Sequence, residues 1–184
     1  MNTVVTSREE ILRICRELIR QHGWPVVQIR AVAGACGVSV GSIYNYFGSK
    51  AELVAAAVES VWQDIFCQAE GAGREDLLSY LTWLYGRMEY GGRTYPGFFS
   101  LHAAGFLGED RADGRRRMRQ AWDQIQTELE AVLHRDPRIR PGAFDETFTP
   151  ERFAGTLFSL LLSAPLQGDY DPAAALELSR RLLY

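Results

Sequence analysis

Residues 28–53 have the sequence QIRAVAGACGVSVGSIYNYFGSKAEL, in which apolar residues repeat at the spacing of a helix face on both sides of Gly37. A second glycine, Gly48, ends the pattern, and glycine is the residue that most often follows a helix end. Two short helices joined by a tight turn are therefore expected, which is a helix-turn-helix. The apolar positions that define them are Ile29, Val32, Ala33 and Cys36 before the turn and Val40, Ile43 and Phe47 after it.

Two capping boxes mark the helices on either side of this unit. Ser7 and Glu10 form an S-x-x-E pattern that predicts a helix from about residue 8 to His22. Ser49 and Glu52 repeat the pattern and predict a longer helix that stops near residue 71. Residues 1–48 are thus predicted to form a three-helix head, and residues 49–184 a helical body.

The remainder of the chain also shows the helical period, without strand-like alternation bounded by turns. A cluster of breakers at 91–97 is expected to end one helix, and Thr149 with Pro150 to begin another. The fold class expected is all-α, with about nine helices. The helices expected in the body after residue 71 are 75–89, 98–107, one that begins near 110–114 and ends at 135, 150–164 and 172–183.

The second helix of the unit is predicted to read DNA, because its inward register leaves a polar, small-residue outer face that fits a major groove. Gly41 permits close approach to base edges, and Asn45 can bond adenine through two hydrogen bonds. Hydroxyl groups and the chain's single lysine, Lys50, can hold phosphates. Tyr44 and Tyr46 can alternatively be core aromatics. The predicted DNA-binding residues are Gln28, Arg30, Ser39, Gly41, Ser42, Tyr44, Asn45, Tyr46 and Lys50.

Residues Val38 to Leu53 closely resemble the recognition-helix signature of the TetR/AcrR family of bacterial regulators, and the resemblance in motif covers about residues 8–55. It implies that the first three helices bind DNA, that a variable body binds small molecules, and that the last two helices form a homodimer. It also implies DNA-facing positions for the residues from Ser39 to Lys50 named above. The chain departs from the family where Gln28 replaces the usual Thr and Ala31 the usual Asp.

The body is rich in aromatic side chains that can line an apolar pocket, although each can equally be ordinary core. The predicted ligand-pocket residues are Trp62, Phe66, Trp83, Phe98, Phe99, His102, Phe106 and Trp122. The last two predicted helices are apolar on more than one face, which suits a twofold partner as well as a core. The predicted dimer residues are Phe153, Leu157, Phe158, Leu161, Leu178 and Leu182.

Composition and charge exclude several classes of protein. The chain is 47% hydrophobic and 23% charged, which argues against disorder. Residues 1–50 carry a net charge of +3 and the rest −6, as expected for a head that binds a polyanion. No signal peptide or membrane span is expected, and the protein is therefore expected to be cytoplasmic. The scattered histidines and cysteines predict no metal site and no cofactor, and the three cysteines are expected to be reduced core residues.

Two other functions compete with DNA binding. Residues 37–41 fit the G-x-S-x-G pattern of a hydrolase nucleophile, but that pattern needs a preceding strand and none is expected, so no enzyme is predicted. A helical module that binds another protein is the alternative. The arginines of the first helix, Arg8, Arg13, Arg16 and Arg20, are expected to form a solvated face rather than a DNA surface. The partners predicted are a double-stranded operator, a small-molecule effector and a second copy of the chain.

Overall fold

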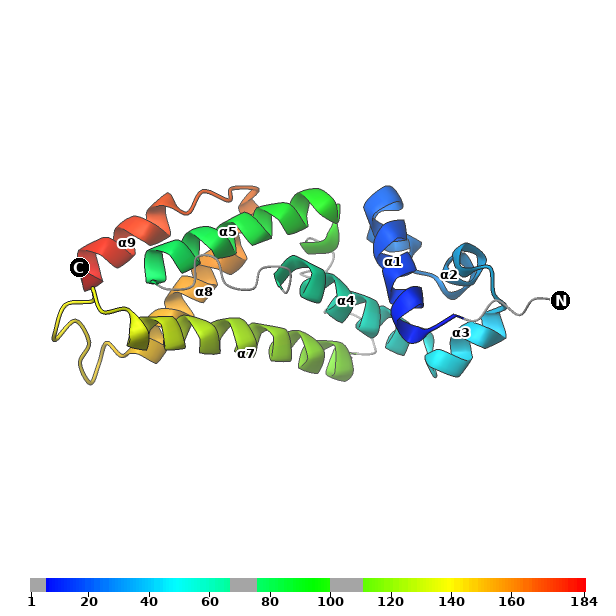
Figure 1. Cartoon of the computed structure of the whole chain (residues 1–184), viewed down its shortest axis with the longest axis horizontal. Helices are drawn as coiled ribbons and strands as arrows, with labels where there is room; N and C mark the ends of the chain where they lie inside the picture. Colours follow the sequence, from blue (N-terminus) through cyan, green and yellow to red (C-terminus); the bar gives the residue numbers. More distant parts are fainter. Residues whose placement is uncertain (1–5, 67–75, 100–110) are drawn as a thin grey trace. The chain divides into compact units, whose positions relative to one another are not determined.

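The computed structural model describes residues 6–66, 76–99 and 111–184, with side chains from Trp122 onward in the last range. These residues form eight α-helices and a short 3-10 helix, and no strand occurs among them (Figure 1). The all-α prediction is confirmed, while the helix predicted over 98–107 lies largely outside the described residues. The helices are α1 (Arg8–His22), the 3-10 helix (Trp24–Val26), α2 (Ile29–Cys36), α3 (Val40–Tyr46), α4 (Lys50–Phe66), α5 (Leu77–Thr94), α7 (Arg111–Arg135), α8 (Pro150–Gln167) and α9 (Ala173–Leu183).

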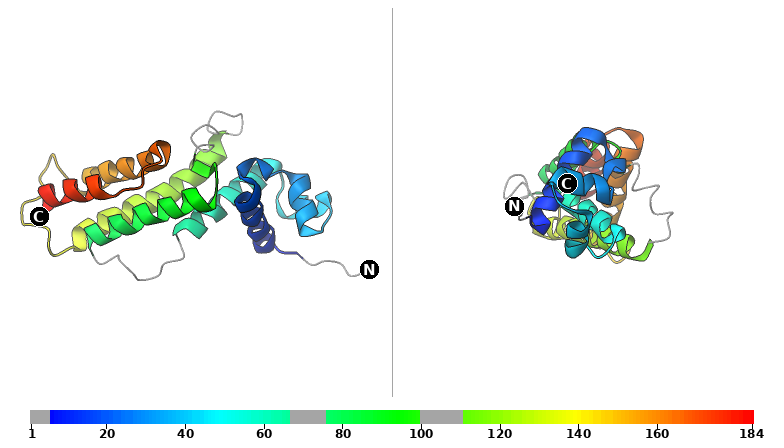
Figure 2. Two further views of the ribbon diagram at one scale, coloured as in Figure 1. Left: turned by 90° about the horizontal axis from the view of Figure 1, so that it is seen from above. Right: turned by 90° about the vertical axis from the view of Figure 1, so that its right-hand side faces the viewer.

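The helices divide between two compact units. The first contains α1, α2, α3, α4 as far as Ile65, and the end of α5 from Gly91. The second contains most of α5, α7 from Arg119, and the whole of α8 and α9. Figure 2 shows α8 and α9 side by side within the second unit, in orange and red. None of the described helices combines the length and the apolar character that a bilayer crossing requires.

Side-chain caps begin several helices at the predicted residues. Ser7 accepts from the Glu10 amide at 3.1 Å, and Ser49 accepts from the Glu52 amide at 3.0 Å. Thr149 accepts from the Arg152 amide at 3.3 Å, with Pro150 in the first turn of α8. These bonds satisfy amides that the helix itself leaves unpaired. The caps therefore fix the helix starts where the sequence predicted them.

The prediction that the 91–97 cluster ends the helix before Gly91 is wrong, because α5 continues to Thr94. Gly91 is a packing residue of the helix. A Cβ atom there would lie 2.6 Å from Ile65 Cδ1, closer than such atoms approach, and 3.0 Å from Phe99 Cζ, which is a tight contact. The absence of a side chain thus lets α5 approach α4 closely.

Substitution of Gly91 by alanine is expected to lower the free energy of unfolding by about 2 kcal/mol, because the added methyl group overpacks the contact with Ile65. Gly86 on the same helix is the matched control. A Cβ atom there meets nothing within 4 Å, so Gly86→Ala is expected to stabilise the protein by roughly 0.5–1 kcal/mol through helix propensity. Urea denaturation measures both. Equal effects of the two substitutions would contradict the close approach.

A buried carboxylate joins three segments of the second unit. Asp136 Oδ2 accepts from the Leu77 amide at 3.1 Å, at the start of α5, and from the Tyr184 hydroxyl at 2.5 Å. The Arg138 guanidinium lies 3.2 Å from Asp136 Oδ1 and 2.5 Å from Asp76 Oδ1. Burial alone would raise the pKa of Asp136, but the hydrogen bonds from Arg138, Tyr184 and the Leu77 amide outweigh it and lower the pKa to about 2. This carboxylate therefore joins the start of α5, the end of α7 and the last residue of the chain.

Asp136→Asn is expected to lower the free energy of unfolding by about 2 kcal/mol at neutral pH, because the charged hydrogen bonds are removed. The folded-state pKa lies below the ordinary 3.8, so the stabilisation is complete above that value and is lost as pH falls towards 2. The difference between wild type and variant should accordingly shrink below about pH 4. Urea titrations at several pH values measure it, with exposed Asp123→Asn as control. A difference that does not change with pH would contradict this role of Asp136.

Candidate nucleic-acid interface

The turn between α2 and α3 is built on the backbone freedom of Gly37. Its φ of +66° and ψ of +27° are left-handed, a conformation that other residues rarely adopt. The amide of Val38 then donates to the Ala33 carbonyl at 3.0 Å, which closes the end of α2. Ser39 caps α3 by accepting from the Ser42 amide at 3.0 Å. The predicted helix-turn-helix is present, with α3 in the position of the recognition helix.

The two faces of α3 differ in how far they are buried. Ile43 and Phe47 are fully buried, as the sequence predicts. Val40 differs from its prediction as an inward residue, because 38% of it is exposed. It occupies the first turn of a seven-residue helix, at the edge of a small core that Ile43 and Phe47 already fill. Tyr44 is exposed to 46%, so its prediction as an outward residue holds and its interpretation as a core aromatic does not.

Four of the predicted DNA-facing side chains are exposed and make no hydrogen bond or ion pair with any described residue: Arg30, Tyr44, Asn45 and Lys50. Arg30 lies in the first turn of α2, Tyr44 and Asn45 on the outer face of α3, and Lys50 at the start of α4. These side chains are available to an external partner. Gly41, on the same helix as Tyr44, is also exposed.

The other predicted DNA-facing polar groups already have partners inside the chain. The Ser39 and Ser42 hydroxyls lie 2.9 Å apart and share a hydrogen bond. The Tyr46 hydroxyl donates to the Thr6 carbonyl at 2.5 Å, so this tyrosine holds the segment before α1 although its ring is partly exposed. Gln28 is extended and supplies no side-chain cap to α2, and its amide reaches only the Pro25 carbonyl at 3.5 Å.

Arg8 connects α1 to the end of α3 and the start of α4. Its guanidinium donates to the Tyr46 carbonyl at 3.0 Å, lies 3.4 Å from a Glu52 carboxylate oxygen, and covers the Phe47 ring at 4.5 Å. Glu52 in turn accepts from the Gly48 amide at 2.9 Å. These contacts position the turn that carries Lys50.

Arg16 and Arg20 connect α1 to α4 and to the residue after α5. Arg16 donates to the Ser60 hydroxyl, and Arg20 donates to Asp64 Oδ2 at 3.1 Å and to the Tyr95 hydroxyl at 2.8 Å. Tyr95 also donates to Asp64 at 2.7 Å. Burial, followed by the Asp64 carboxylate, raises the pKa of the Tyr95 phenol. The prediction of a purely solvated arginine face is therefore wrong for Arg8, Arg16 and Arg20, because non-local partners partly bury them.

Comparison with known proteins assigns this head to a family. The sequence model described as "Bacterial regulatory proteins, tetR family" matches residues 11–57, which run from α1 into α4. Residues 11–57 therefore match the tetR family of bacterial regulatory proteins. A putative transcriptional regulator from Rhodococcus sp. RHA1 has the same fold, with a TM-score of 0.67, 19% identity, and coverage of 96% of this chain and 94% of that one.

Two further proteins are similar to this chain over most of its length. The reduced form of NemR from E. coli superposes with a TM-score of 0.65 at 22% identity and covers 96% of this chain and 97% of its own. The nucleoid occlusion factor SlmA from Marinomonas sp. (strain MWYL1) is 24% identical over 141 residues, which are 73% of this chain and 69% of that protein. The fold extends beyond the head, because the structural matches cover nearly the whole chain.

The predicted ligand-pocket residues fall in both units. In the first, Trp62 packs edge-on against Phe98 and Phe99 at ring separations of 5.6 and 5.7 Å. In the second, Phe66 contacts Trp83 at 6.1 Å, and Trp122 contacts Phe158 at 5.9 Å. Trp62 and Phe98 are buried, while the other four of these predicted residues retain partial exposure: Phe66, Trp83, Phe99 and Trp122. His102 and Phe106 lie outside the described residues.

The predicted dimer residues need a correction. Four of the six, Phe153, Leu157, Phe158 and Leu161, are 0–3% exposed within the single chain, because α8 turns this face into its own subunit core. They cannot supply the accessible face of a dimer. Leu178 and Leu182 on α9 remain half-buried, and Leu166 near the end of α8 is 67% exposed.

Removal of a single hydroxyl distinguishes Tyr46, which bonds within the chain, from Tyr44, which is available to an external partner. Tyr46→Phe deletes the bond to the Thr6 carbonyl and is expected to lower the free energy of unfolding by about 1 kcal/mol. Tyr44→Phe deletes a hydroxyl that bonds no described residue, and it should change the free energy of unfolding by less than about 0.5 kcal/mol. Chemical denaturation of the two variants measures this. A larger loss for Tyr44→Phe than for Tyr46→Phe would contradict the two roles.

Proposed function

We propose that this tetR-family protein is a cytoplasmic transcriptional regulator that binds a pseudo-palindromic DNA operator as a homodimer, and that a small apolar or aromatic ligand releases it. The observation that carries the proposal is the outer face of α3. There Tyr44 and Asn45 are exposed and have no partner among the described residues, while Ile43 and Phe47 hold the helix from its other side. A helix with one face anchored and a polar face available suits insertion into the major groove.

Each available group has a distinct role in the proposed complex. The Asn45 amide can bond N6 and N7 of an adenine, and exposed Val40 can contact a thymine methyl group. Tyr44, Lys50 and Arg30 can bond phosphates on either side of the groove, which fixes the register of α3 on the duplex. Val40 is a base-reading residue that the sequence did not predict. A helical pattern alone does not reveal which apolar residue of a short helix lies beyond the edge of the core.

The contacts of α1 with α4 offer a route from the ligand to DNA. Arg20 and Asp64 meet at Tyr95, whose ring lies 6.3 Å from Phe98, itself 5.6 Å from Trp62. Trp62 and Phe98 belong to the predicted ligand pocket, so a ligand that moves these rings also acts on the interaction between α1 and α4. A ligand shifts the equilibrium if it binds one arrangement of these residues more tightly than the other.

One polar group of the body supports a ligand with a hydrogen-bond acceptor. The Trp122 indole N–H is buried, and no described residue accepts its hydrogen bond. An unpaired buried donor costs free energy that an acceptor on a ligand would recover. For the dimer, the partly exposed leucines of α8 and α9 are the proposed interface residues: Leu160, Leu162, Leu166, Leu178 and Leu182.

Alanine substitution of Tyr44 and of Lys50 tests the proposal. Each variant is expected to bind the DNA that flanks its own gene about tenfold more weakly, which corresponds to about 1.4 kcal/mol. Lys50→Ala should also flatten the dependence of log Kd on log salt concentration by about one unit, because the variant neutralises one phosphate fewer. Fluorescence anisotropy at several salt concentrations measures both effects.

Arg181→Ala is the matched control, because Arg181 is an exposed cation on α9. It is expected to bind DNA as the wild type does. Wild-type affinity in both the Tyr44 and Lys50 variants would overturn the assignment of the interface. A different result would favour the protein-binding module instead. In that case the protein forms no DNA complex, and its affinity for a protein partner does not change between about 50 and 200 mM salt.

A further inference from the structure

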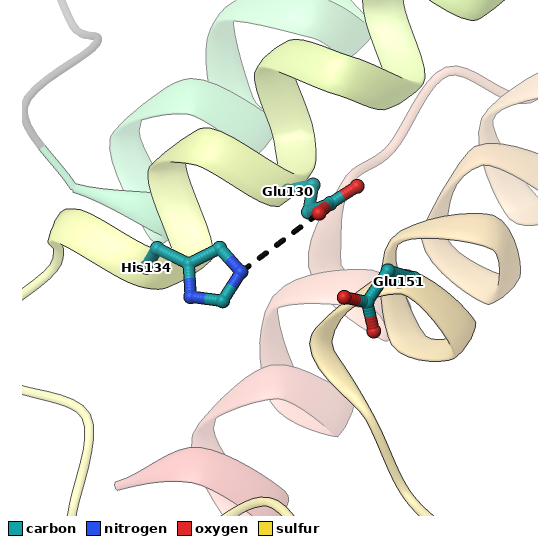
Figure 3. A group of neighbouring side chains, drawn as sticks. All are labelled: Glu130, His134 and Glu151. Carbon is teal, nitrogen blue, oxygen red and sulfur yellow. Dashed lines mark ion pairs between the residues drawn. The ribbon is translucent and has the colours of Figure 1, made fainter.

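Three side chains of metal-ligating type meet where α7 ends and α8 begins. Glu130 and His134 lie one turn apart on α7, and Glu151 lies in the first turn of α8. Figure 3 shows all three on facing surfaces of the two helices. Their ligand atoms all lie within 4.8 Å of one another, and His134 Nε2 is 3.8 Å from Glu130 Oε1. Sequence spacing alone did not indicate a metal site, because the third ligand comes from another helix.

The charges at this cluster are not balanced by arginine. Among the described residues, the only ionic partner of Glu130 is His134, and Glu151 has no ion pair. The nearby arginines are engaged elsewhere: Arg135 pairs with Glu128 at 2.8 Å, and Arg152 donates to the Thr147 carbonyl at 2.7 Å. Two carboxylates therefore face one imidazole, an arrangement that a bound cation would stabilise.

Glu151 is placed by the start of α8. Thr149 caps this helix by accepting a hydrogen bond from the Arg152 amide at 3.3 Å, and Pro150 lies in its first turn. The backbone of Glu151 is therefore fixed relative to the helix start.

We propose that Glu130, His134 and Glu151 bind a divalent transition-metal ion of the zinc type, with a water molecule in the fourth position. One imidazole nitrogen and two carboxylate oxygens suit zinc, whereas magnesium and calcium prefer oxygen alone. A tetrahedral zinc site with bonds of about 2.0–2.2 Å places its ligand atoms roughly 3.4 Å apart. The three ligand atoms here lie within 4.8 Å of one another, so metal binding requires rotation of the half-buried Glu130 side chain and of the exposed His134 and Glu151 side chains.

The ion would join the last turn of α7 to the first turn of α8, and so close the loop of residues 136–149. Ligands at i and i+4 on one helix form a chelate, as in other helical zinc sites, and the third ligand adds the cross-link. An ion that binds the folded chain but not the unfolded chain raises the thermal stability of the protein. This site does not depend on DNA binding and remains testable if the proposed function fails.

Calorimetric titration of ZnCl₂ into the metal-free, tag-free protein of residues 1–184 tests the proposal. His134→Ala and Glu151→Gln are each expected to weaken zinc binding at least tenfold and to reduce the zinc-induced rise in Tm. His22→Ala and Glu128→Gln are the matched controls, because they remove an exposed histidine of α1 and a paired glutamate of α7, and both should bind zinc as the wild type does.

Co²⁺ gives a second readout that does not depend on stability. The visible absorption of bound Co²⁺ is expected in the wild type and in the control variants, and to be absent in His134→Ala. MgCl₂ should compete with neither ion at equal concentration. The site would be overturned if the wild type, His134→Ala and Glu151→Gln had the same zinc affinity and the same zinc-induced rise in Tm. Unchanged Co²⁺ absorption in His134→Ala would also overturn it.

Discussion

Burial of Ile43 and Phe47 is the constraint on which the arrangement of the head depends. A helix of seven residues has too few internal hydrogen bonds to be stable alone, so tertiary packing must hold α3. With both side chains fully buried, the rotation of α3 about its axis is fixed, and Tyr44 and Asn45 are necessarily exposed. The polar surface proposed to read DNA therefore follows from the apolar one that is buried.

The arginines of α1 extend this constraint to the neighbouring helices. Arg8 covers Phe47 and bonds the end of α3, and Arg20 joins α4 through Asp64. Because α1 makes both interactions, a shift of α4 relative to α1 also alters the support of the recognition helix. The head and the start of the body are coupled by these few charged groups as well as by the apolar core.

Local signals allowed much of the fold and of the interface to be predicted from the sequence. Caps such as Ser7 and Thr149 act within one turn, so the helices begin where the sequence indicated. The outer face of α3 was likewise predictable, since helical period alone separates Tyr44 and Asn45 from Ile43. Contacts between distant residues were not predictable in the same way. Gly91 was interpreted as a helix breaker because the sequence does not show its close contact with Ile65, which lies on another helix.

Arg20 was interpreted as solvated because Asp64 and Tyr95 are far away in sequence. The bond from Tyr46 to Thr6 and the burial of four α8 residues were not predicted for the same reason: the period of a helix gives its faces but not what covers each one.

The central claim, that α3 reads base edges, is tested most directly by selection of binding sites from random double-stranded DNA with the wild type and with Asn45→Ala. The account predicts that the wild type enriches an inverted repeat with half-sites about one helical turn apart, or a multiple of it. It predicts that Asn45→Ala loses the preference for one adenine in each half-site while keeping the others. Absence of an enriched repeat, or the same base preferences in both proteins, would contradict it.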